Sequence, residues 1–219
     1  ADALGFVFAP SRRRISPGDA KQIIDELPDT VEKVGVFVNE DVRTVEEIAT
    51  YCGLTMIQLH GEENDEMVGL LSYPVVKAVG IGSKQDVRFA EQFHTPYLLV
   101  DSPKGQHFHG GNGETFDWSL LADINRQEHK LILAGGLTTE NVDIAIAKVQ
   151  PYMVDVSSGV ETDGKKDWNK IRAFLQAAKI FSSCALFNSS NFSSSYFSSM
   201  LLYSACNSLE ISSKLSHKP

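Results

Sequence analysis

The feature that most constrains the fold of this chain is a regular alternation of short apolar runs with longer amphipathic stretches. Seven apolar runs have the length of strands, and they cover residues 3–8, 34–38, 56–59, 75–79, 97–100, 131–133 and 152–156. Helix start signals stand between them at Ser16-Pro17-Gly18-Asp19, Asp41, Ser83 and Thr138-Thr139-Glu140. Strands that are apolar on both faces and alternate with helices predict an α/β fold with a parallel sheet, either a (β/α)8 barrel or a doubly wound open sheet.

The alternation stops near Ile180, and 14 of the last 40 residues are serine. Aromatic residues are scattered among these serines with no steady period of a strand or a helix. We therefore expect an α/β domain over residues 1–179 and a Ser-rich, low-complexity tail over residues 180–219 that is poorly ordered. A docked segment or a membrane-seeking peptide is the alternative interpretation of the tail.

Composition is that of an ordinary globular protein and argues against several other classes. With 20 Lys and Arg against 28 Asp and Glu, the formal charge is −8, which disfavours extensive binding to nucleic acid or to anionic membranes. We find no run of about 18 apolar residues and no opening signal segment. The cysteines Cys52, Cys184 and Cys206 form no paired motif, so we expect no disulfide or zinc site and a cytoplasmic location.

Polar residues directly follow six of the seven apolar runs. The segments are Ala9-Pro10-Ser11-Arg12-Arg13-Arg14, Asn39-Glu40, His60-Gly61, Asp101-Ser102, Ala134-Gly135-Gly136 and Ser157-Ser158-Gly159. Parallel barrels build their active sites from the loops at the carboxyl ends of the strands. The recurrence of polar residues at these positions therefore predicts one site there.

The last two of these segments have the character of phosphate-binding loops. Gly135, Gly136, Ser157, Ser158 and Gly159 carry small side chains, so backbone N–H groups can approach an anion closely. Barrels with phosphorylated substrates commonly bind the phosphate at the loops after their last two strands. A glycine pair taken alone is more often a tight turn, but two such segments after successive final strands favour a phosphate site.

Four further positions are candidates for substrate chemistry. Asp101 follows a short apolar run, where partial burial would raise the pKa of its carboxyl toward the range of a proton donor, although a helix cap is the alternative. Asp155 lies inside the last run, where a carboxylate needs a polar partner or a ligand. One of the residues Arg12–Arg14 could pair with a substrate carboxylate instead of being solvated. We expect His60 to donate or accept hydrogen bonds at the same end of the barrel.

The glycine-rich stretch of residues 105–113 resembles a mobile covering loop. It contains His107 and His109, but two histidines without a nearby acidic pair are a weak metal signal. We therefore predict no metal and no organic cofactor.

Taken together, these motifs resemble the phosphoribosylanthranilate isomerase family. The similarity covers residues 1 to about 179, and the matching motifs occur in order at residues 3–8, 11–17, 35–39, 58–61, 99–101, 110–113, 116–118, 133–137, 141–142, 155–161 and 164–167. The resemblance implies a TIM barrel that converts N-(5-phosphoribosyl)anthranilate into 1-(2-carboxyphenylamino)-1-deoxyribulose 5-phosphate by an Amadori rearrangement. This reaction belongs to tryptophan biosynthesis and uses no metal or cofactor.

The resemblance also implies roles for individual residues. Asp101 is implied to be the general acid, and Arg13 is implied to hold the anthranilate carboxylate. His60 and Asp155 are implied to be further substrate-binding residues at the barrel mouth. The phosphate is implied to bind backbone N–H groups of the segments that contain Gly136, Ser158 and Gly159.

One part of the family pattern has no match. The family's general base is a cysteine in a Lys-x-Cys-Gly motif at the end of its first strand, and none of the three cysteines here stands in such a motif. The chain also begins at Ala1, inside an apolar run. We therefore expect a barrel that lacks its first βα unit and shows seven, with low activity of this chain alone. Two unpaired edge strands would then favour a homo-oligomer or a covering partner.

Two other functions remain open at this point. Another phosphosugar barrel enzyme, such as an indole-3-glycerol-phosphate synthase or a ribulose-phosphate epimerase relative, would need a lysine pair or a set of metal ligands. Lys77 is the only lysine inside a predicted strand, and the sequence has no evident metal set. A non-catalytic phosphate-ligand-binding barrel would bind its ligand without turnover.

Overall fold

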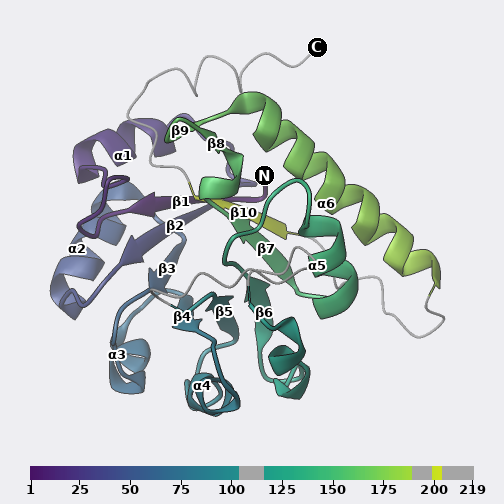
Figure 1. The fold of residues 1–219 in the computed structure, drawn as a ribbon. Helices are drawn as coiled ribbons and strands as arrows, with labels where there is room; N and C mark the ends of the chain where they lie inside the picture. The colour runs from purple at the N-terminus through teal and green to yellow at the C-terminus, as the bar shows by residue number, and fades with distance from the viewer. Residues whose placement is uncertain (104–115, 189–198, 204–219) are drawn as a thin grey trace.

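A computed structural model describes residues 1–103, 116–188 and 199–203 of the chain (Figure 1). All seven predicted strands are present, so the sequence prediction of an α/β fold with a parallel sheet is confirmed. They are β1 (Ala3–Val7), β2 (Glu32–Phe37), β3 (Met56–Leu59), β4 (Val75–Gly80), β5 (Tyr97–Asp101), β6 (Lys130–Leu133) and β7 (Met153–Val156). Each pairs in parallel with the next along the chain.

The strands close into a barrel through a strand that the sequence did not predict. The barrel order is β1-β10-β7-β6-β5-β4-β3-β2, where β10 is Ser199–Tyr203. Ala3 of β1 is in register with Leu201, and Asp155 of β7 is in register with the same residue. The expectation that β1 and β7 are unpaired edges is therefore wrong, because a segment of the Ser-rich tail supplies hydrogen-bonding partners to both.

Helices surround the barrel in the order expected of βα units (Figure 1). They are α1 (Pro17–Ile24), α2 (Val42–Cys52), α3 (Asp65–Leu70), α4 (Lys84–Ala90), α5 (Val142–Val149) and α6 (Trp168–Asn188), with the 3-10 helices η1 (Trp118–Asp123) and η2 (Ser158–Val160). The boundary expected at residue 179 falls inside α6. A short antiparallel hairpin of β8 (Glu161–Thr162) and β9 (Lys165–Lys166) follows η2.

Three of the four predicted start signals cap helices in the structure; the fourth, at Thr138-Thr139-Glu140, does not, because α5 begins after Asn141, whose side chain makes no capping hydrogen bond. The Ser16 side chain accepts a hydrogen bond from the backbone nitrogen of Asp19, and Asp41 accepts one from Thr44 in the same way. Ser83 caps α4 through the nitrogen of Asp86. These contacts satisfy N–H groups that have no partner inside the helix.

The core has two layers because strand side chains alternate in direction. Residues such as Val34, Val76, Leu99 and Met153 fill the barrel interior, while the larger cluster between strands and helices includes Phe37, Ile57 and Leu98. Alternation therefore decides which strand residues face the barrel axis, and Asp101 and Asp155 share a direction with Leu99 and Met153.

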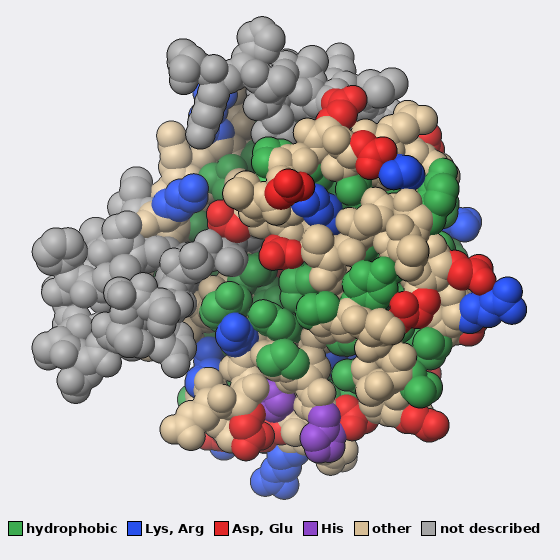
Figure 2. Space-filling view, turned by 180° about the vertical axis from the view of Figure 1, so that it is seen from behind, with side chains coloured by type: hydrophobic (Ala, Val, Ile, Leu, Met, Phe, Trp, Pro, Cys, Tyr) green, Lys and Arg blue, Asp and Glu red, His purple; other side chains and the backbone are tan. Residues whose placement is uncertain are grey.

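The surface is mixed in charge. Figure 2 shows acidic and basic side chains interspersed with hydrophobic ones on the face turned away from the viewer in Figure 1. Within the described part of the chain, no helix has both the length and the apolar character needed to cross a membrane.

Candidate active site

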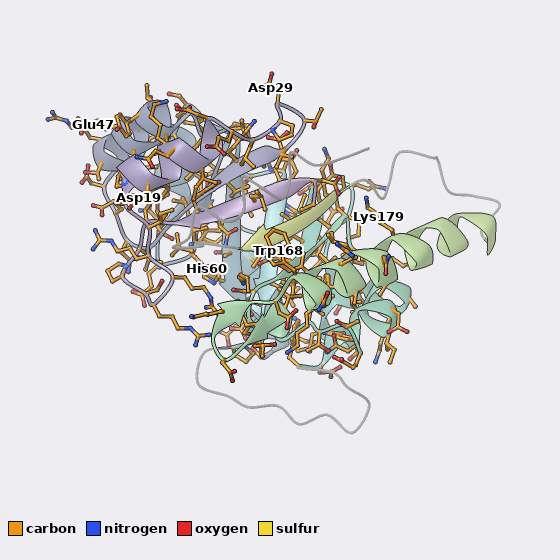
Figure 3. The ribbon with its side chains drawn as sticks, turned by 90° about the horizontal axis from the view of Figure 1, so that it is seen from above. Asp19, Asp29, Glu47, His60, Trp168 and Lys179 are labelled. Atoms are coloured by element: carbon orange, nitrogen blue, oxygen red, sulfur yellow. The ribbon has the colours of Figure 1, made fainter. Side chains whose placement is uncertain are left out.

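The predicted site residues gather at the carboxyl ends of the strands, the end that we call the mouth. His60 directly follows β3, Asp101 ends β5, Gly135 lies just after β6, and Asp155 is in β7. Figure 3 shows Glu47 on the outer side of α2, away from His60. The opposite end, where the strands begin, is called the floor.

The two loops predicted to bind phosphate are in contact with each other. A Cβ on Gly159 would lie 1.9 Å from the carbonyl oxygen of Leu137, so the loop after β7 packs directly on the loop after β6. Gly135 and Gly136 have φ values of +84° and +64°, which glycine adopts without strain. A Cβ on Gly135 would also lie 2.8 Å from Oδ1 of Asp101. Glycine at this position therefore lets the phosphate loop approach the Asp101 carboxyl.

Asp101 is oriented from two sides. Its Oδ1 accepts a hydrogen bond of 2.7 Å from the backbone nitrogen of Ser102, and its Oδ2 lies 3.6 Å from Nε2 of His60. The side-chain nitrogen of the buried Gln58 lies 2.9 Å from Nδ1 of His60. The Gln58 amide therefore holds the His60 ring with its Nε2 facing Asp101.

Asp155 is the buried acid of the mouth. Its side chain is enclosed, and its Oδ1 has no hydrogen-bond partner among the described residues. Burial raises the pKa of Asp155 well above its usual value, and the negative charge of Asp101 adds to this, while Lys166 and Arg13 oppose it. The carboxyl of Asp155 is therefore protonated under conditions in which an exposed aspartate is ionised.

Arg13 and Arg12 are held by one carboxylate. Nε of Arg13 donates to Oε1 of Glu161 at 2.9 Å, and Nη2 of Arg12 donates to Oε2 of the same residue at 2.9 Å. The Glu161 side chain is only 6% exposed. Of the arginines after β1, the structure therefore brings Arg12 and Arg13 to the loop after β7, which the sequence did not predict.

Lys166 completes this cluster. Its Nζ lies 3.2 Å from Oε1 of Glu161 and donates to the carbonyl oxygen of Ser157 at 2.8 Å. Burial opposes ionisation of Glu161, but its hydrogen bonds to Arg13 and Lys166 outweigh burial and lower the pKa of the carboxyl. Burial also lowers the pKa of Lys166, although Glu161 partly offsets this. Glu161 is therefore ionised beside three cationic side chains.

Lys77 does not act at the mouth as a catalytic lysine would. It points outward from β4, and its Nζ donates to Oε2 of Glu63 at 2.7 Å and to the carbonyl oxygen of Gly61 at 2.8 Å. Both side chains of this ion pair are almost completely buried. Glu63 in turn accepts from the backbone nitrogen of Asn39. The pair therefore holds the loop that carries His60, and it offers no support for a synthase-type lysine pair.

The remaining sequence candidates lie elsewhere. Cys52 is buried at the end of α2 with its Sγ 3.4 Å from the carbonyl oxygen of Pro17, and burial raises the pKa of its thiol. The stretch of residues 105–113, with His107 and His109, lies outside the described residues. Among the residues that are described, no three His, Cys, Asp or Glu side chains are grouped as metal ligands.

Comparison with known proteins assigns the chain to a family. The model of the family described as N-(5'phosphoribosyl)anthranilate (PRA) isomerase matches residues 1–177. The chain belongs to this family. It is 56% identical to N-(5'-phosphoribosyl)anthranilate isomerase of Bacillus mycoides over 180 residues, which are 82% of this chain and 88% of that protein.

Solved structures of the family agree with this assignment. The Thermotoga maritima phosphoribosyl anthranilate isomerase superposes with a TM-score of 0.74 at 43% identity, covering 82% of this chain and 88% of that one. A family member solved in complex with reduced 1-(o-carboxyphenylamino)-1-deoxyribulose 5-phosphate gives a TM-score of 0.71 at 42% identity, with the same coverage of both chains.

The family prediction made from the motifs is therefore confirmed. The chain is an isomerase, and its reaction is the isomerisation of N-(5'-phosphoribosyl)anthranilate in tryptophan biosynthesis. The ligand in the solved complex supports a small phosphorylated molecule as the binding partner of this fold.

Proposed function

We propose that the mouth performs the reaction as an Amadori rearrangement with Asp101 as the general acid. Asp101 donates a proton to the ring oxygen of the phosphoribosyl group as the bond from this oxygen to C1 breaks, and the anilino nitrogen forms a double bond to C1. Loss of the C2 proton then gives an enolamine, which tautomerises to the ketone. No oxidant or cofactor is needed, because the oxidation of C2 balances the reduction of C1.

The observation that carries this proposal is the closeness of Asp101 to the first phosphate loop. Because a Cβ on Gly135 would contact Oδ1 of Asp101, a phosphate bound at this loop places the sugar against the acid. His60 supports the acid by turning its Nε2 toward Oδ2. The backbone N–H groups of Gly135, Gly136, Ser157, Ser158 and Gly159 are proposed to bind the phosphate.

Arg13 is proposed to bind the anthranilate carboxylate, and Asp155 to contact the substrate near the second phosphate loop. A protonated Asp155 donates a hydrogen bond to a sugar oxygen but accepts a proton poorly. Cys52 is buried at the end of α2, so it does not fill the place of the family's cysteine base. A cytoplasmic location is proposed as well, in keeping with free Cys52 and a reducing setting.

Binding of the reduced product tests the proposed site without depending on turnover. Replacing Arg13 by alanine is expected to weaken binding by roughly 1.5–3 kcal/mol, the range of a hydrogen bond between charged groups. Arg43→Ala is the matched control, because Arg43 forms an exposed pair with Glu47 on α2. Calorimetry that gives equal affinities for the parent and the Arg13 variant would remove Arg13 from the site.

A further inference from the structure

We propose that Glu161 is a positioning residue that sets the selectivity of the mouth for a carboxylated aryl group, by orienting Arg13. The inference rests on the proposed function, in which Arg13 receives the anthranilate carboxylate. Glu161 does not itself touch the substrate. It fixes which edge of the Arg13 guanidinium is free for the substrate.

Glu161 occupies only one of the donors of the Arg13 guanidinium. A guanidinium has five N–H donors in a rigid plane, and a carboxylate uses two of them when it binds end-on. The Nε of Arg13 is taken by Glu161 at 2.9 Å. Within residues 1–103 and 116–179, the structure gives no hydrogen bond from the Nη atoms of Arg13 to the protein. The pair with Glu161 therefore leaves the terminal edge of the guanidinium available for a bidentate contact.

Glu161 is itself held firmly in place. Its side chain is 6% exposed, whereas Arg13 is 26% exposed and Arg12 is 62% exposed. Each of its oxygens is fixed by a different arginine, and Lys166 lies 3.2 Å from Oε1. A buried carboxylate with three cationic neighbours has little freedom to rotate, so it holds Arg13 in one orientation.

The cluster of Arg12, Arg13, Glu161 and Lys166 connects two loops of the mouth that are far apart in the sequence. Arg12 and Arg13 belong to the loop after β1, and Glu161 and Lys166 belong to the hairpin after β7; these strands are separated in the barrel by β10. Lys166 also donates to the carbonyl oxygen of Ser157 in the second phosphate loop. The cluster therefore sets the spacing between the group that binds the carboxylate and the loop that binds the phosphate.

Basic side chains outnumber acidic ones in this cluster. Three cationic side chains, those of Arg12, Arg13 and Lys166, lie against the single carboxylate of Glu161. The excess of positive charge at the mouth matches a substrate that carries both a carboxylate and a phosphate.

Two ligands and one isosteric variant test the inference. The ligands are reduced 1-(o-carboxyphenylamino)-1-deoxyribulose 5-phosphate and the same compound with a phenylamino group, which lacks the carboxylate. Glu161→Gln is expected to lose roughly tenfold in affinity for the carboxylated ligand, the low end for a misplaced charged hydrogen bond. Its affinity for the phenylamino ligand is expected to stay at the parent value. Glu47→Gln removes the same charge from an exposed Arg43 pair on α2 and is expected to change neither affinity.

The Arg13→Ala variant shows whether Glu161 acts by positioning Arg13 or has a general structural role. In Arg13→Ala, the added Glu161→Gln substitution is expected to have no further effect on the carboxylated ligand, because the residue through which Glu161 acts is absent. Equal losses for both ligands, or an added loss in the Arg13→Ala background, would overturn the inference. If Glu161→Gln does not fold, Glu161→Asp replaces it: a partial loss of preference supports the inference, and full parental preference overturns it.

The same measurements distinguish failure of this inference from failure of the proposed function. A parent chain that binds the two ligands equally would show that Arg13 does not read the carboxylate, which overturns the proposed role of Arg13 and this inference with it. A parental preference that depends on Arg13 but not on Glu161 would overturn the inference alone.

Discussion

The two ends of the barrel differ in whether their polar side chains have protein partners. At the floor, the hydroxyl of Thr95 donates to the carbonyl oxygen of Val75, and the ring nitrogen Nδ1 of His129 donates to the carbonyl oxygen of Thr95 at 2.9 Å. The Nζ of Lys130 lies about equally far, at 5.1 and 5.0 Å, from the ring centres of Tyr97 and Tyr152. These groups are satisfied within the protein.

At the mouth, two buried polar atoms are left without such partners. Oε1 of Gln58 and Oδ1 of Asp155 are buried and have no hydrogen-bond partner among the described residues. Polar groups of this kind are costly in the free protein and become satisfied when a ligand supplies the missing partner.

From this difference we propose that stability depends mainly on the floor of the barrel and chemistry on the mouth. Substitutions at the floor are expected to lower the free energy of unfolding and to leave the reaction unchanged. Substitutions at the mouth are expected to slow the reaction or weaken ligand binding, with little change in the free energy of unfolding. The four predictions below test this separation, beginning with the largest effect.

Replacing Asp101 by asparagine is expected to give the largest effect on activity with almost no effect on stability. Asparagine keeps the size of the side chain but cannot donate a proton to the ring oxygen, so kcat is expected to fall by about 10²–10⁴-fold. The unfolding free energy is expected to stay within about 0.5 kcal/mol of the parent value. Anthranilate fluorescence follows turnover, urea unfolding follows stability, and Asp123→Asn on η1 serves as the control. Turnover at the parent rate would mean that another group supplies the proton.

Replacing Lys77 by methionine is expected to lower both stability and ligand affinity, so it is an exception to the separation of the two ends. The substitution leaves Glu63 buried without its cation, which is expected to cost about 3–5 kcal/mol of unfolding free energy. Adding Glu63→Gln should recover part of this loss. Because the pair also holds the loop that carries His60, affinity for the reduced product should fall as well.

The control for this prediction is Lys84→Met, which removes an exposed pair with Asp123 and is expected to change stability by less than about 1 kcal/mol. If the Lys77 and Lys84 variants unfold at the same urea concentration, the buried pair contributes no special stability.

Titration of Asp155, a residue of the mouth, is expected to make the free energy of unfolding depend on pH. Its pKa is raised in the folded protein, so the native state keeps a proton that the unfolded state releases above about pH 4. The unfolding free energy contributed by this group therefore falls as pH rises from the unfolded pKa to the folded pKa. Asp155→Asn lacks this titration, so its stability relative to the parent should increase with pH over that window. If urea unfolding gives the same difference in unfolding free energy between the two proteins at every pH in this window, the raised pKa of Asp155 is contradicted.

The smallest effect is expected at the floor. Thr95→Val removes the hydroxyl that donates to Val75 and should lower the unfolding free energy by about 1 kcal/mol, with kcat and product affinity unchanged. Thr50→Val is the control, since the Thr50 hydroxyl is exposed beside Tyr73, and it should cost less. Loss of activity in the Thr95 variant without loss of stability would show that the two ends are coupled.

The sequence predicted those parts of the molecule that depend on local chemistry. Seven strands, the caps at Ser16, Asp41 and Ser83, and the loops at Gly135 and Ser157 follow from apolar runs, capping side chains and small residues. The sequence also predicted that these loops lie at one end of the barrel, because parallel strands run in the same direction. Confirmation of the family extends this success to the reaction itself.

The sequence did not predict the contacts between distant parts of the chain. Glu161 was visible directly after the second phosphate segment, but nothing local showed that two arginines far earlier in the chain would bind it. The pairing of Lys77 with Glu63, and of Gln58 with His60, likewise depends on how neighbouring strands are aligned. The sequence held one indication of these contacts: Lys77 lies inside a buried strand, where a charged side chain needs a partner.

The strand β10 shows the same limit for the fold. A short apolar segment among serines has no periodicity that predicts a strand, yet it pairs with both β1 and β7. Apolar runs, caps and glycines act through neighbours in the sequence, so the sequence by itself determined the elements, the common direction of their loops and the chemistry available at the mouth. Closure of the barrel, protonation of Asp155 and orientation of Arg13 depend on burial and on charges from distant segments, so only the tertiary structure decided them.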